Sequence, residues 1–190
     1  MSPDLSAPAL IERVRRYYPS EIPRGDPRYT QSEEHQRLEH RRREAETEAG
    51  PWHRFVEQVE EAFPGCDVID TPSLLYHPSY GCKVFRREPR APLERTREDF
   101  IVCRLSVLAP VYELHASHHR DDGTERESWT RYPPLPPEFQ PYEDTLTQLL
   151  EAHLGATRLP NEVLFTRVPG IRPHPNRPQH RAPWLMELLF

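Results

Sequence analysis

The chain has few apolar residues and almost no lysine. Only 36% of its 190 residues are hydrophobic, below the roughly 45–50% that is usual for globular domains. No apolar run approaches the roughly 20 residues that a membrane-spanning helix needs, and charged residues and 23 prolines replace the missing apolar ones. We therefore expect one modest core, long proline-stiffened loops and no membrane association.

Lys83 is the only lysine among the 25 lysine and arginine residues. This imbalance has two interpretations. A GC-rich genome favours arginine codons, whereas selection for bidentate donors to phosphate or carboxylate groups favours arginine for its planar fork of N–H groups.

The signatures of several catalytic and metal-binding classes are also missing. Cys66, Cys82 and Cys103 are widely spaced and form no CxxC pair, which predicts buried, reduced thiols. The seven glycines form neither a phosphate-binding loop nor a dinucleotide fingerprint, and no serine lies in a GxSxG motif. The sequence therefore predicts no catalytic residues, no metal and no cofactor.

Residues 1–4 carry neither the charge nor the apolar stretch of a signal peptide, so we expect a cytoplasmic protein.

Strand signals dominate the middle of the chain. Apolar residues occupy every second position from Ile101 to Val107 and again from Tyr112 to Ala116. The Asp122-Gly123 dipeptide is typical of a chain reversal, which predicts a hairpin with residues 124–132 as the returning strand. The Ala109-Pro110 break is compatible with a bulge or with a turn. Shorter strand signals cover 66–69, 74–86 and 162–168.

Helical periodicity frames this region. An apolar stripe runs from Trp52 to Phe63, and a second stripe over 138–154 ends at Gly155. The sequence predicts an α+β fold: a mainly antiparallel sheet of about 5–6 strands with helices packed on one face. Residues 1–50 form a charged helical extension, and residues 51–190 form the α+β domain. The apolar segment 184–190 is expected to dock on this core or on a partner.

The charge distribution points to a protein partner. The net charge of -5 argues against a nucleic-acid partner. Residues 133–162 hold five acids and one base, whereas 163–190 hold four bases and one acid, so the two segments could also pair with each other. We expect a non-enzymatic protein-binding module, of the kind of a bacterial immunity protein that neutralises a cognate basic toxin by direct binding. The expected contact residues are Glu138, Glu143, Asp144, Glu151, Asp121 and Asp122.

The sequence is also compatible with two alternatives. His115, His119 and Asp121 lie near the tip of the expected hairpin, where they are candidate metal ligands of a metal-assisted hydrolase. Their spacing matches no standard zinc signature. The chain is alternatively a structural subunit of a larger assembly, with the charged 31–48 helix and the 184–190 segment as connectors.

Overall fold

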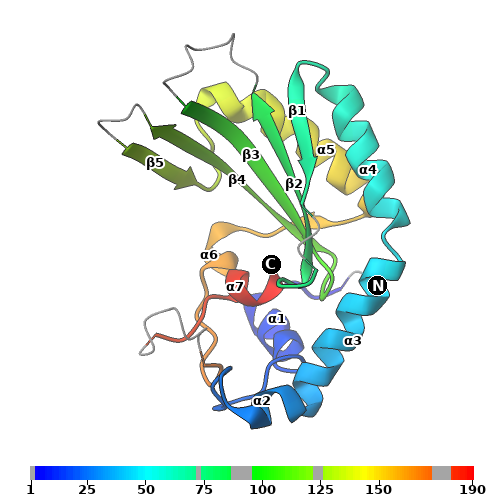
Figure 1. Cartoon of the computed structure of the whole chain (residues 1–190), viewed down its shortest axis with the longest axis vertical. Helices are drawn as coiled ribbons and strands as arrows, with labels where there is room; N and C mark the ends of the chain where they lie inside the picture. Colours follow the sequence, from blue (N-terminus) through cyan, green and yellow to red (C-terminus); the bar gives the residue numbers. More distant parts are fainter. Residues whose placement is uncertain (1–2, 72–73, 87–95, 122–125, 173–180) are drawn as a thin grey trace.

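The computed structural model describes residues 3–71, 74–86, 96–121, 126–172 and 181–190 (Figure 1). The helices are α1 (Ala7–Val14), α2 (Pro27–Gln31), α3 (Glu33–Thr47), α4 (Gly50–Ala62), α5 (Gln140–Leu154), α6 (Asn161–Leu164) and α7 (Leu185–Leu189), with a 3-10 turn at Pro137–Phe139. The strands are β1 (Cys66–Asp70), β2 (Ser79–Arg86), β3 (Thr96–Ser106), β4 (Val111–Asp121), β5 (Arg126–Arg131) and β6 (Thr157–Arg158).

The strands form one sheet in which β1 to β5 pair antiparallel in sequence order, while β6 pairs parallel with β4. The register places Cys82, Cys103 and Leu114 side by side on one face, so the alternating apolar residues share that face. The Ala109-Pro110 break is a turn, because β3 ends at Ser106 and β4 begins at Val111. The expected α+β fold with an antiparallel sheet is confirmed.

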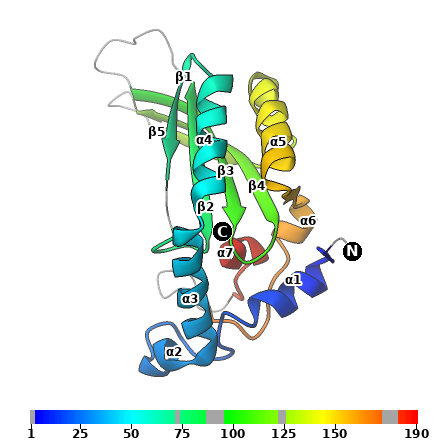
Figure 2. The ribbon, with the colours of Figure 1, turned by 90° about the vertical axis from the view of Figure 1, so that its right-hand side faces the viewer.

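Helices α4 and α5 cover one face of the sheet, side by side (Figure 2). The rings of Phe63 and Tyr142 stack 5.2 Å apart where the two helices meet. The apolar stripe of α4 is buried against the sheet because its residues recur at helical spacing. Helix α5 ends at Gly155, whose φ of +59° is the left-handed conformation that glycine adopts without strain.

The N-terminal helices α1 to α3 and the C-terminal helix α7 pack together at the end of the molecule opposite to α4, α5 and most of the sheet (Figure 1). Leu10 and Val14 of α1 and Leu185 and Leu188 of α7 belong to the same buried cluster as the sheet residues. The apolar segment 184–190 therefore docks on the chain's own core. This core runs without interruption through residues of both 1–50 and 51–190.

The charged helix α3 is anchored on the body of the protein. Leu38 and Ala45 are buried, and the Nε of Arg41 donates a hydrogen bond to the carbonyl oxygen of Val107 at 2.9 Å. The hydroxyl of Tyr80 on β2 donates to the carbonyl oxygen of Ala45 at 2.5 Å. These bonds hold helix α3 at the end of the sheet where β2 begins (Figure 1), and its Arg42 lines a cavity there.

The prediction of a strand over 162–168 is wrong. This region begins with the short helix α6, and only Arg167 forms an isolated bridge, with Trp184. The amides of Leu164 and Phe165 donate to the carbonyl oxygens of Pro160 and Asn161, so i→i+4 bonds replace a strand ladder.

The three cysteines are free thiols, and Cys82 and Cys103 are buried. In the described ranges, none of the helices has the length and apolar character needed to cross a bilayer.

Candidate functional site

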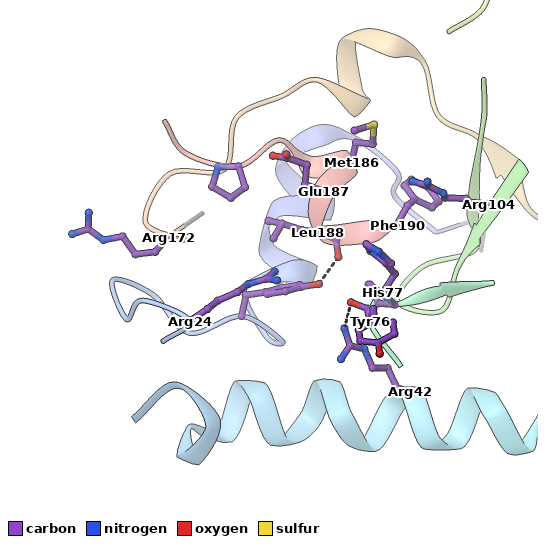
Figure 3. A pocket seen from close by; sticks show the side chains of 13 residues that line it. Arg24, Arg42, Tyr76, His77, Arg104, Arg172, Met186, Glu187, Leu188 and Phe190 are labelled. Atoms are coloured by element: carbon purple, nitrogen blue, oxygen red, sulfur yellow. Dashed lines mark hydrogen bonds between the residues drawn. The ribbon is translucent and has the colours of Figure 1, made fainter. Parts of the chain in front are cut away.

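A cavity of about 490 Å³ opens where α3, the loop 74–78 and the C-terminal segment meet (Figure 3). We call it the arginine pocket, because four of its lining residues are arginines from four separate parts of the chain. Its lining residues are Tyr18, Arg24, Arg42, Tyr76, His77, Pro78, Arg104, Arg172, Pro183, Met186, Glu187, Leu188 and Phe190.

Different elements position the four arginines. Arg24 follows α1, and its guanidinium lies over the Tyr18 ring at 5.6 Å from the ring centre. Arg42 projects from α3 and donates to the carbonyl oxygen of Tyr76 at 3.0 Å. Arg104 extends from β3. In Figure 3, Arg24 and Arg42 approach the space between α3 and α7, whereas the guanidinium of Arg172 points away from it.

Carboxylates neutralise part of this positive charge. Arg42 donates to Glu39 at 2.6 Å, the Nε of Arg104 lies 3.7 Å from a carboxylate oxygen of Glu113, and Arg172 pairs with Glu21 at 2.8 Å. Arg24 has no carboxylate partner among the residues that the structure describes. Among the four arginines, Arg24 is therefore the one whose charge is not offset by a described carboxylate.

Two N–H groups of the pocket are buried and unsatisfied. The Nε atoms of Arg24 and Arg42 have no hydrogen-bond partner in the described part of the chain. Buried polar groups in folded proteins are nearly always hydrogen-bonded, and an unpaired donor is costly. An acceptor that entered this region after a small local adjustment would relieve that cost.

Burial and the positive charge of the pocket both lower the pKa of His77. Partial burial lowers the pKa of His77 below its ordinary value, and the charges of Arg104, Arg42 and Arg24 lower it further. Each of these arginines disfavours a second positive charge on the imidazole. The three guanidinium groups therefore act together on one point at the wall of the pocket.

Aromatic and aliphatic side chains complete the walls. Tyr18 is buried, and its hydroxyl donates to the carbonyl oxygen of Leu188 at 2.8 Å; burial raises the pKa of this phenol above its ordinary value. Tyr76 is 74% exposed at the rim. A ligand with an anionic group and a carbon body finds both kinds of contact here.

The residues expected to contact a basic partner are not all available. Glu138, Asp144 and Glu151 are exposed on the 3-10 turn and on α5, and Glu151 accepts a hydrogen bond from the Tyr112 hydroxyl at 3.1 Å. Glu143 is buried and accepts from Arg158 at 2.5 Å, so its charge is not part of the exposed surface. The backbone of Asp121 ends β4, but its side chain and all of Asp122 lie outside the described residues.

The histidines of the hairpin have other partners than a metal. The Nδ1 of His115 lies 2.9 Å from a carboxylate oxygen of Glu113, and His119 stacks on Phe100 at 5.5 Å. Within the described residues, no group of three or more histidine, cysteine, aspartate or glutamate side chains has the arrangement of a metal site. His118 points to the opposite face, where its Nδ1 lies 2.5 Å from a carboxylate oxygen of Asp99.

Sequence reasoning did not find the arginine pocket. Its cations come from positions 24, 42, 104 and 172, which no local motif connects. The abundance of arginine was the one available signal, but it did not indicate which arginines converge. Only the tertiary arrangement of α3, β3 and the C-terminal segment brings them together.

Comparisons with protein-family models, with curated proteins and with solved structures found no match to this chain.

Proposed function

We propose that this chain is a non-enzymatic binding protein that holds a carboxylate or phosphate group in the arginine pocket. The observation that carries the proposal is the convergence of Arg24, Arg42 and Arg104 on one cavity, with the Nε of Arg24 and Arg42 unpartnered among the described residues. Guanidinium groups bind oxyanions through paired N–H bonds, which gives both strength and orientation.

The size and walls of the pocket favour a small organic anion. A volume of about 490 Å³ lies within the range of roughly 300–1,000 Å³ that is typical of small-molecule sites. Tyr18, Leu188 and Phe190 offer apolar surface to the body of such a ligand. Binding is favoured over nucleophilic catalysis because no serine or cysteine is among the described lining residues.

A thermal-shift measurement tests this proposal. The full chain is melted at low salt with inorganic phosphate, pyrophosphate, citrate or benzoate, each against chloride at equal ionic strength. At least one oxyanion is expected to raise the melting temperature of the wild type, because a ligand that binds only the folded state stabilises it.

Matched variants make the result specific to the pocket. Arg24→Gln and Arg42→Gln are expected to lose most of the ligand-dependent shift. Arg54→Gln removes the same charge from an exposed site on α4 and is expected to retain the shift. An equal response in all three variants would show that the anions act through general charge screening, and it would contradict the proposal.

A second candidate function is the binding of a basic protein, as in immunity-type inhibitors. The observation that favours it is the acidic character of the helical layer: α4 and α5 lie side by side (Figure 2). Together with the 3-10 turn before α5, they expose a set of acids that the sequence places far apart. This acidic helical face comprises Glu57, Glu60, Glu61, Glu138, Asp144 and Glu151. Arg54 is the only arginine or lysine on these two helices. Such a surface accelerates association with a basic partner.

Charge-neutralising variants test this second candidate. A variant with Glu57→Gln, Glu60→Gln, Asp144→Asn and Glu151→Gln is compared with one that neutralises four exposed acids elsewhere, Glu12, Glu33, Glu46 and Glu48. Both are used to capture partners from source-cell lysate at low and high salt. A basic partner that is lost only from the first variant and at high salt supports the hypothesis. Equal capture by both variants contradicts it.

A further inference from the structure

A second cavity of about 490 Å³ opens beside α5, between β6, α6 and the prolines that follow β5. We call it the Glu143 pocket. Its lining residues are Leu114, Pro133, Pro134, Glu143, Arg158, Leu159, Pro160, Asn161, Glu162 and Leu164. None of them lines the arginine pocket, so the two cavities are separate sites.

Glu143 contributes a buried carboxylate to this cavity, and only one of its two oxygens has a hydrogen-bond partner among the described residues. Its side chain is 5% exposed, and its Oε1 accepts from the Nη1 of Arg158 at 2.5 Å. Its Oε2 is buried and has no hydrogen-bond partner among the described residues. A carboxylate is an acceptor with several lone pairs, and leaving one of its oxygens dry and unbonded is costly. Within the described part of the chain, Oε2 therefore lacks a donor.

The charge around Glu143 favours a cationic donor. The lining holds two acids, Glu143 and Glu162, against one base, Arg158. Glu162 is exposed at the rim. A cation on Oε2 would place the Glu143 carboxylate between two positive groups, which compensates its burial better than Arg158 alone.

The remaining walls fit an aliphatic stem. Three prolines and three leucines supply apolar surface around the carboxylate. The side-chain amide of Asn161 donates to the carbonyl oxygen of Pro133 at 2.7 Å, which fixes the proline wall against α6. Long cationic side chains pack their methylene groups on apolar surface in this way while the charged head finds a polar partner.

We propose that the Glu143 pocket binds an organic cation that carries an ammonium or guanidinium head on an aliphatic chain. The head donates to Oε2 of Glu143, with Glu162 as a second acidic neighbour at the rim, and the chain packs on the prolines and leucines. Since Oε2 is buried, the side chain of Glu143 or of a neighbour shifts slightly when the cation enters. The inference is independent of the arginine pocket.

This cation has two possible sources with the same chemistry. It is either a free small amine or the lysine or arginine side chain of another protein. Glu143 belongs to α5, which also carries part of the acidic helical face, so a basic partner of that face would be one source of such a side chain. The experiment below separates the two sources.

The test is an NMR titration of the isotope-labelled full chain. The probes are N-acetyl-lysine methylamide and N-acetyl-arginine methylamide, the free amines cadaverine and agmatine, and the uncharged N-acetyl-norleucine methylamide as a stem-only control. Cationic probes are expected to shift the backbone amide signals of Leu159, of residues 161–164 and of Glu143. They are expected to bind at least tenfold more tightly than the norleucine probe. Tighter binding of the capped amino acids indicates a protein side chain, and tighter binding of the free amines indicates a small-molecule ligand.

Three variants make the test decisive. Glu143→Gln is expected to weaken binding of the cationic probes about tenfold, and Glu162→Gln about two- to threefold, since an exposed charge is partly screened. Asp144→Asn, an exposed neighbour on α5, is expected to leave binding unchanged. If Glu143→Gln does not fold, two comparisons still decide: Glu162→Gln against Asp144→Asn, and the charged probes against the norleucine probe. Equal binding of charged and uncharged probes, or equal effects of Glu162→Gln and Asp144→Asn, would overturn the proposal.

Discussion

The Tyr18 hydroxyl donates a buried hydrogen bond of 2.8 Å to the carbonyl oxygen of Leu188, a residue 170 positions further along the chain. Both residues line the arginine pocket. The bond joins the segment after α1 to α7, so the pocket exists only when the N-terminal and C-terminal segments are docked together. Stability of this junction and ligand binding are therefore expected to be linked.

Tyr18→Phe removes this hydroxyl and leaves the buried Leu188 carbonyl without its donor. We expect the free energy of unfolding to fall by about 1 kcal/mol, the usual net value of such a bond. Urea denaturation of the full chain measures the change. Tyr76→Phe is the control, because Tyr76 is 74% exposed and its loss of a hydroxyl is expected to cost almost nothing. A cost for Tyr18→Phe as small as that of the control would contradict the role of the bond.

The lowered pKa of His77 predicts a pH dependence of stability. Partial burial and the neighbouring arginines lower the pKa of His77 in the folded chain, whereas in the unfolded chain it titrates near its ordinary pKa of 6.5. As the pH falls below about 6.5, His77 becomes protonated in the unfolded state before it does in the folded state, so it lowers stability in acid. This contribution vanishes above that pH. Urea unfolding at a series of pH values is expected to show a flatter profile for His77→Asn.

Binding of an anion is expected to raise the pKa of His77, which burial and the arginines lower. An oxyanion in the arginine pocket offsets the arginine charges and favours the protonated imidazole, so binding takes up a proton. Affinity is therefore expected to increase as the pH is lowered toward the pKa of His77 in the folded chain, and to increase less in His77→Asn. Titration calorimetry at two pH values measures this, with an oxyanion that does not itself titrate between them. An affinity that is independent of pH in the wild type would place His77 outside the binding site.

The Glu143–Arg158 pair predicts a cost for the loss of its cation. Arg158→Met leaves the Glu143 carboxylate buried without a partner, which typically destabilises by roughly 3–5 kcal/mol when both groups are fully buried. Because the Arg158 side chain is 34% exposed, we expect about 2 kcal/mol, measured by urea denaturation. Arg54→Met on the exposed side of α4 is the control. No difference between the two variants would indicate that water reaches Glu143 and satisfies it.

The burial of Leu38 predicts that the charged helix α3 contributes to stability. Leu38 is 2% exposed, so Leu38→Ala is expected to cost about 2–4 kcal/mol through lost burial and the cavity that remains. Leu75→Ala removes the same atoms from a side chain that is 75% exposed and is expected to cost less than about 0.5 kcal/mol. Thermal or urea denaturation compares the two. Similar costs would mean that α3 is not firmly packed in solution.

Periodicity carried the prediction of the sheet and of its helical cover. The alternation from Ile101 to Val107 and the stripe from Trp52 to Phe63 correspond to β3 and α4, because burial of one face imposes a period of two or of 3.6 residues. The pattern over 162–168 misled, since a four-residue helix and a short strand have the same apolar content. Local hydrogen bonds to Pro160 and Asn161 decided that region.

The positions of charged side chains were harder to predict. Glu143 follows Phe139 by four residues and precedes Leu146 by three, so it lies on the buried stripe of α5. That spacing was available in the sequence, but the residue type suggested exposure. The partner that permits its burial, Arg158, comes from β6, and a contact between separate elements leaves no periodic signal.

The most direct test of the arginine pocket is to observe the arginine Nε–H signals of the full chain by NMR while an oxyanion identified in the thermal-shift series is added. The Nε–H groups of Arg24 and Arg42, which lack partners among the described residues, are expected to shift and saturate with a single affinity. The Nε–H of the exposed Arg54 is expected to stay unchanged at constant ionic strength. Shifts that grow equally for all arginines without saturation would contradict binding in the pocket.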